Sequence, residues 1–191
     1  MDFLDQVYFD NTLKSYFIVL GIVLVVMLFR KPLSHGISSL FYLLIKRRWK
    51  SIEKREFTIL TIRPLSWLLV VIVSVFALDK LTFPSALDFK IYGHSSEEIT
   101  ARLGITIIIV MFIWFVLSLI DFIALLLKNP GAEKVDKGHD QVVVFFRDFL
   151  KVVIGIIGAL MIIKAALNQD IGSVLTGLSI VGAALALAGK E

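Results

Sequence analysis

The sequence contains no cysteine, and its three histidines, His35, His94 and His139, lie far apart. Disulfide bonds and cysteine-ligated metals are therefore excluded, and we expect neither a metal site nor a bound cofactor. The residue sets of enzymes are missing too, because no Ser-His-Asp set, phosphate-binding glycine loop, zinc spacing or facing pair of carboxylates can be assembled. The sequence therefore predicts a protein that is not an enzyme.

Positive charge is scarce at the start of the chain. Asp2, Asp5 and Asp10 precede the first cation, Lys14, which is the reverse of the basic beginning of a signal peptide. We therefore expect no cleavage of a signal peptide from the N-terminus. The overall net charge is +4 and the isoelectric point is near 9.3, but the cations are concentrated in one loop and indicate membrane topology, not a nucleic-acid partner.

Apolar residues dominate the composition. Of 191 residues 58% are hydrophobic, and the mean hydropathy is +0.87, far above the values of soluble globular domains. A helix needs about twenty residues to cross a hydrocarbon core about 30 Å thick. Five segments meet this requirement: Asn11–Phe29, Leu60–Leu81, Leu103–Leu127, Val142–Ile163 and Ile171–Gly189. We predict an all-α, polytopic membrane protein with five transmembrane helices.

The segments between the spans divide the chain. The polar linker 128–140 contains Pro130 and Gly131 as helix breakers and separates a front unit of three spans, 1–127, from the C-terminal pair, 141–191. The turn from Leu167 to Asp170 is so short that spans four and five must form an antiparallel hairpin.

Lysine and arginine are distributed unequally between the loops. Segment 30–63 holds nine cations against Glu53 and Glu56, whereas the loop between spans two and three holds three cations against four acids. Cytoplasmic loops carry the excess of cations, so we expect the N-terminus outside and the C-terminus in the cytoplasm. Within the basic loop, Leu33–Ile45 is too short to span; we interpret it as an interfacial helix at lipid headgroups, with a re-entrant hairpin as the alternative.

The last span is apolar but not bulky, since ten of the eighteen residues 172–189 are Gly, Ala or Ser. Small residues allow helix backbones to approach closely in membranes, so this helix is expected to face protein. Leu178, Val181 and Leu185 share one face. In a symmetric oligomer they would form apolar rings that gate by dewetting. Tight structural packing without a pore is the alternative, and the polar or broken helices of a transporter site are not visible.

The run LTGLSIVGAALALAGKE, residues 175–191, resembles the pore helix of the small-conductance mechanosensitive channel family. The resemblance implies a pore constriction at Val181 and Leu185, with Leu178 brought in by a shift of register. It also implies small residues over which neighbouring helices slide and a kink at Gly189. The small residues are Gly177, Gly182, Ala184 and Ala186.

The resemblance covers the membrane portion of that family and does not include the family's cytoplasmic β domain and cage. It implies a homo-oligomer, a heptamer, in the bacterial inner membrane that opens under tension and releases ions and small osmolytes. Residues 1–127 would then be a peripheral tension-sensing unit in contact with membrane lipids. The competing hypothesis is a membrane anchor or assembly module that conducts nothing.

Asp121 is the single charge within the third span. A carboxylate in a span costs about 2.5 to 3.5 kcal/mol on insertion scales, so it needs a partner. We expect a structural ion pair with Arg147 or Lys151 on span four, at similar depth. A proton-relay or ion-coordinating role is the alternative for Asp121, and the cluster on span four could instead hold lipid headgroups.

Overall fold

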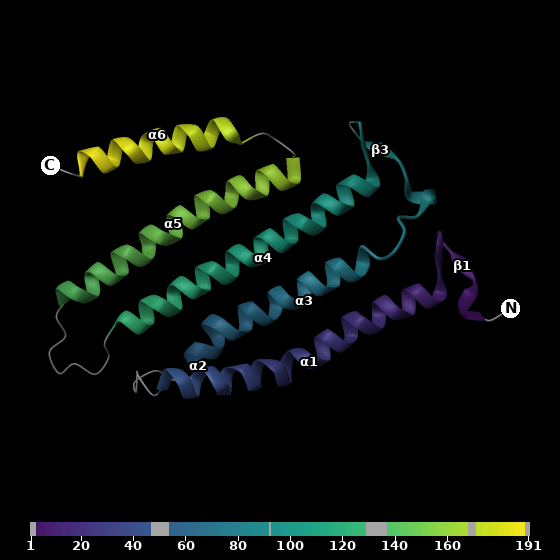
Figure 1. The fold of residues 1–191 in the computed structure, drawn as a ribbon, viewed down its shortest axis with the longest axis horizontal. Coiled ribbons are helices and arrows are strands. Elements are labelled where there is room, and N and C mark those ends of the chain that lie inside the picture. The colour runs from purple at the N-terminus through teal and green to yellow at the C-terminus, as the bar shows by residue number, and fades with distance from the viewer. Residues whose placement is uncertain (1–2, 47–53, 92, 129–136, 168–170, 190–191) are drawn as a thin grey trace.

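The computed structural model describes residues 3–46, 54–91, 93–128, 137–167 and 171–189. Five long helices make up most of it, as predicted: α1 (Leu13–Lys46), α3 (Arg63–Leu78), α4 (Ser96–Leu127), α5 (Lys137–Leu167) and α6 (Gly172–Ala188). A short helix α2 (Lys54–Phe57) and a π-helix η2 (Thr58–Ile62) lead directly into α3. The helices form one row in the order α1, α3, α4, α5, α6 (Figure 1), and α1 packs on α3, α3 on α4, and α4 on α5.

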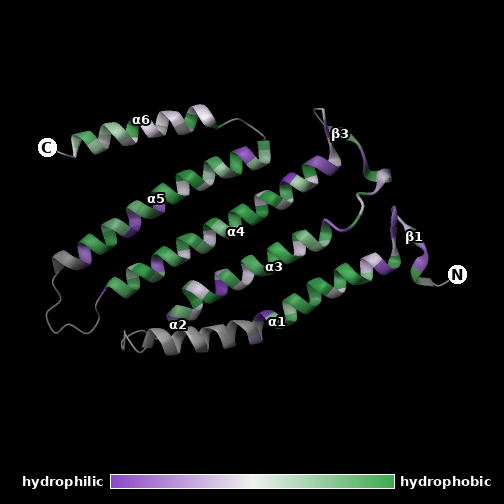
Figure 2. Ribbon diagram, in the orientation of Figure 1, coloured by the Kyte–Doolittle hydropathy of each residue, from purple (hydrophilic) through white to green (hydrophobic). Residues whose placement is uncertain are grey.

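Among the described residues, four helices are long and apolar enough to cross a membrane: Leu13–Arg30, Arg55–Leu78, Ser96–Leu127 and Asp140–Leu167. Figure 2 shows hydrophobic residues along almost their whole length. This confirms four of the predicted spans by length and composition. With 17 residues, or about 25 Å, the described helix α6 is apolar but shorter than these four. The fifth span stays a prediction.

The structure shifts the boundaries of several predicted segments. The first span begins at Leu13, because Asn11 and Thr12 form a strand, and its helix continues to Lys46. The basic segment 30–63 is therefore largely helical, and Leu33–Ile45 extends α1 without a re-entrant hairpin. Pro32 lies inside α1, which bends along its length in Figure 1, as proline in a helix commonly causes. Of the linker 128–140, residues 129–136 lie outside the described part and α5 begins at Lys137.

A small buried cluster joins α2 and η2 to the C-terminal part of α4, at one end of the helix axes. Phe57, Ile62 and Phe122 are buried together, with Leu60, Leu119 and Leu126 against them. The rings of Phe57 and Phe122 meet edge to face, with centroids 5.2 Å apart, a preferred geometry for aromatic pairs. The cluster therefore connects η2, and through it α3, to the end of α4.

Two β-hairpins lie at the other end of the helix axes, which is called here the hairpin end (Figure 1). They were not predicted from the sequence. Strands β1 (Val7–Tyr8) and β2 (Asn11–Thr12) pair antiparallel through a turn in which Phe9 and Asp10 have φ of 48° and 63°. Positive φ at both central residues is the turn geometry that matches the twist of a hairpin. Strands β3 (Lys90–Ile91) and β4 (His94–Ser95) form the second hairpin, in which Gly93 has φ of 85°.

The first hairpin is fastened to the loop after α3. The Asn11 amide donates to the carbonyl of Thr82 at 2.7 Å and accepts from its backbone N–H at 2.8 Å. The Asp10 carboxylate accepts from the backbone N–H of Ser85 at 2.6 Å. Hydrogen bonds from Ser85 lower the pKa of Asp10 below its ordinary value, because they stabilise the charged form. We call these contacts the N-terminal clasp.

Candidate functional site

Helices α4 and α5 pack against each other closely, and a glycine lies at their contact. Gly158 of α5 is buried, and a Cβ atom at this position would lie 2.6 Å from Cδ1 of Ile113 on α4. Gly104 of α4 allows a similar approach to α3, since a Cβ atom at this position would lie 3.1 Å from Cγ1 of Val75. The absence of a side chain at these two positions lets neighbouring helices approach closely.

The charge inside the third span has a partner on α5. The Lys151 ammonium lies 2.6 Å from Oδ1 and 2.7 Å from Oδ2 of Asp121. The two side chains are 33% and 29% exposed. Of the two cations considered from the sequence, the structure brings Lys151 to Asp121. Arg147 instead bonds its neighbour Asp148 on the same helix, with Nη2 2.7 Å from Oδ1.

This pair is a structural bridge between the front unit and α5. Each ion neutralises the other within apolar surroundings, where an isolated charge is costly. No group of three or more His, Asp or Glu side chains that could hold a metal is found among the described residues. The geometry therefore supports a structural ion pair. Among the described residues, no further group indicates a proton relay through Asp121.

Helix α6 contrasts with the rest of the row, because every one of its described side chains is exposed. Val181 is 57% exposed, and the small residues Gly182, Ala184 and Ala186 are exposed as well. A Cβ atom built at Gly177 or Gly182 would meet nothing within 4 Å. Gly189 lies in the turn that follows the helix. Leu178 and Leu185 are helical positions whose side chains lie outside the described part.

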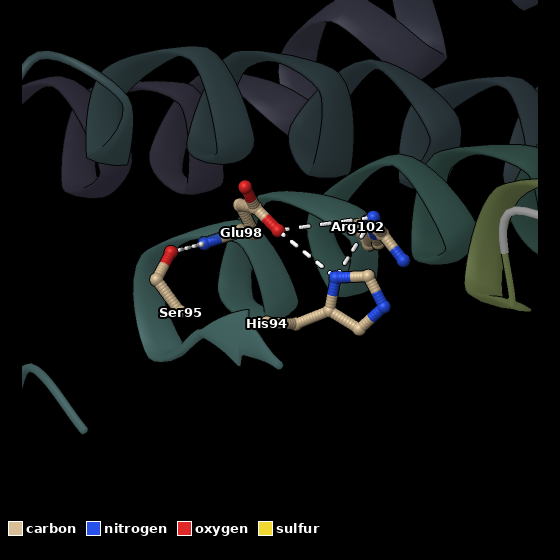
Figure 3. Close-up of polar contacts among 4 residues, drawn as sticks. All are labelled: His94, Ser95, Glu98 and Arg102. Atoms are coloured by element: carbon tan, nitrogen blue, oxygen red, sulfur yellow. Dashed lines mark hydrogen bonds and ion pairs between the residues drawn. The ribbon is translucent and has the colours of Figure 1, made fainter. Parts of the chain in front are cut away.

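A polar cluster at the hairpin end was missed by the sequence analysis, which counted these residues only as loop charges. Ser95 precedes α4 and accepts a hydrogen bond from the Glu98 backbone N–H at 3.2 Å, which caps the helix. The Glu98 carboxylate lies 3.1 Å from Nδ1 of His94 and 3.8 Å from Nη2 of Arg102 (Figure 3). The serine three residues before Glu98, and the arginine four residues after it, are the signals that could have predicted this arrangement.

Comparisons with protein-family models, with curated proteins and with solved structures find no match to this chain.

Proposed function

We propose that the chain is a subunit of a tension-gated ion channel, in which α6 helices from several copies surround a central pore. The observation that carries the proposal is the exposure of α6. Its described side chains find no cover within the chain, yet it is rich in Gly, Ala and Ser. Lipid tails gain little from such small side chains, whereas a second helix can approach them closely. The surface of α6 thus suits other copies of the same helix.

The proposed gate is apolar. Rings of Val181 and Leu185, or of Leu178 after a shift of register, would leave a bore too narrow and too apolar for a continuous column of water. Gly177, Gly182, Ala184 and Ala186 would provide the contact surface between neighbouring α6 helices, and Gly189 the kink. The family resemblance supplies the heptamer and the bacterial inner membrane. The distribution of lysine and arginine between the loops supplies the orientation, with the N-terminus outside and the C-terminus in the cytoplasm.

The row of helices provides a route by which tension would reach α6. Neighbouring helices are in contact from α1 through α3 and α4 to α5. The Arg30 guanidinium lies 3.7 Å from the centre of the Trp67 ring, which adds a cation–π contact between α1 and α3. The pair between Asp121 and Lys151 completes the route to α5. Tension favours the state that occupies more membrane area, because a stimulus shifts a population only if it distinguishes the two states.

The direct test is electrical recording from the purified chain in liposomes under graded suction. We expect conductance steps that appear only above a threshold of tension. Leu185→Ser should hydrate the constriction and make the pore leaky at rest. The matched control is Leu28→Ser, an exposed leucine of α1 at the opposite edge of the row, which should leave the resting current unchanged.

The same recordings address the anchor hypothesis. Silence at every tension, together with oligomers that cross-link through α6, would support a non-conducting assembly module and contradict the channel. A Leu185→Ser variant that closes as tightly as the unchanged chain would remove Leu185 from the gate.

A further inference from the structure

A cavity of about 300 Å³ opens at the hairpin end, between the beginning of α4 and the end of α5. It is lined by His94, Ile99, Arg102, Leu103, Ala166 and Leu167. Helix α4 begins here at Ser96 and helix α5 ends here at Leu167, and both are long and apolar enough to cross a membrane. The cavity therefore lies at the ends of two candidate membrane-spanning helices, where lipid headgroups are expected.

The Arg102 guanidinium has more N–H donors than its described polar neighbours accept. The Arg102 side chain is only 24% exposed, yet its two described polar neighbours are distant: Oε2 of Glu98 at 3.8 Å and Nδ1 of His94 at 3.5 Å. A charge-assisted N–H···O bond is normally about 2.7–2.9 Å long. Both contacts of Arg102 involve Nη2, and Nδ1 of His94 also lies 3.1 Å from the Glu98 carboxylate. A guanidinium has five N–H donors, so this half-buried group can also donate to an acceptor from outside.

The other walls of the cavity define the kind of acceptor. Ile99, Leu103, Ala166 and Leu167 are apolar and lie on the side of the spans. A small hydrated anion would gain nothing from these walls, whereas an amphiphile would place its charged group at Arg102 and its hydrocarbon against them. The planar fork of arginine matches two phosphate oxygens.

We propose that this cavity binds the phosphate group of a glycerophospholipid. Arg102 would donate to the phosphate oxygens, with His94 beside it. The four apolar residues would contact the glycerol backbone and the first methylenes of the acyl chains. Such a lipid would bridge α4 and the end of α5. The proposal does not depend on the channel hypothesis, because a lipid can occupy this cavity in a single chain.

The test is native mass spectrometry of the purified chain with added dioleoyl phosphatidylglycerol, which gives the dissociation constant of the first bound lipid. Arg102→Gln should weaken this binding about tenfold or more, because a charge-assisted contact is lost. The matched control is Lys80→Gln, which removes an exposed cation at the same end of the row but outside the cavity. This control should change the constant less than twofold.

Two further variants keep the proposal testable if Arg102→Gln fails to fold. Glu98→Gln removes a negative charge 3.8 Å from Arg102 that would repel a phosphate group, and it should tighten lipid binding. Ala166→Phe fills the apolar wall and should weaken it. Equal binding by the Arg102→Gln and Lys80→Gln variants would overturn the proposal. Displacement of the lipid by millimolar inorganic phosphate, with no effect of Ala166→Phe, would overturn it in favour of a free-anion site.

Discussion

Gly158 of α5 and the glycines Gly177 and Gly182 of α6 occupy opposite environments. A side chain at Gly158 of α5 would collide with Ile113 of α4, whereas a side chain at Gly177 or Gly182 of α6 would meet nothing within 4 Å. The missing side chain at Gly158 therefore allows a helix contact within the chain. At Gly177 and Gly182 it leaves a surface that no atom of the chain approaches within 4 Å of the Cβ position. The difference teaches that the row from α1 to α5 is held together by its own contacts, while α6 presents its small residues outward.

The largest expected effect comes from breaking the pair between α4 and α5. Lys151→Met leaves the Asp121 carboxylate without its partner in apolar surroundings and should lower the free energy of unfolding by about 2–4 kcal/mol. Removing both charges, in Asp121→Asn with Lys151→Met, should restore most of the loss. Denaturant titration in mixed micelles measures both. If the double variant is no more stable than Lys151→Met, the pair is not the bridge described here.

Closing the space at Gly158 should have the next largest effect. Gly158→Ala places a methyl group against Ile113 and should cost about 1–3 kcal/mol, because overpacking forces the helices apart. Gly155→Ala, on the same helix with nothing within 4 Å, should be neutral or stabilise by up to about 1 kcal/mol. The same titration applies. Equal effects of the two substitutions would contradict the close contact between α4 and α5.

A substitution on α6 should change the gating of the channel without changing the stability of the single chain. A Cβ atom at Gly182 meets nothing within 4 Å, so Gly182→Leu should change the free energy of unfolding in micelles by no more than about 0.5 kcal/mol. In the assembled channel the added side chain should obstruct the sliding of neighbouring helices and raise the tension threshold. Suction recordings in liposomes measure the threshold. An unchanged threshold would count against α6 as the moving contact.

The smallest effect concerns the N-terminal clasp and is visible in its pH dependence. The pKa of Asp10 is lower in the folded chain than its ordinary 3.8. Its contribution is therefore fully present above about pH 4 and is lost as the pH falls through the lower folded value. Hydrogen exchange of the Ser85 amide should accelerate relative to Asp88 below pH 3.8, after correction for intrinsic rates. Asp10→Asn should remove most of this difference.

The four long spans were predictable because hydropathy over about twenty residues is a strong signal. The approximate depth of Asp121 and of the cations on α5 similarly limited its partner to two residues. Choosing Lys151 over Arg147 required the rotation of α5 about its axis, which brings Lys151 to Asp121, while Arg147 pairs with its neighbour Asp148. That rotation depends on packing and is not encoded in the spacing of charges alone.

The features that were missed depend on contacts between distant segments or on uncommon backbone geometry. Asn11 bonds Thr82, which lies 71 residues away, and Phe9 has a positive φ although no Asn-Gly or Gly-Gly pair marks the turn. Pro32 ordinarily indicates the end of a helix, but α1 continues through it. In a membrane helix the freed backbone group can find other partners, so proline is a weaker boundary signal there.

The most direct test of the central claim uses the absence of cysteine from the chain. Val181→Cys introduces a single thiol on α6, and Leu28→Cys introduces a control thiol on α1, at the opposite edge of the row. Tension-activated currents would be recorded before and after a charged, water-soluble thiol reagent is added. We predict that the reagent blocks the current of the Val181→Cys channel and leaves that of Leu28→Cys unchanged. Equal insensitivity of both currents would contradict a pore lined by α6 at Val181.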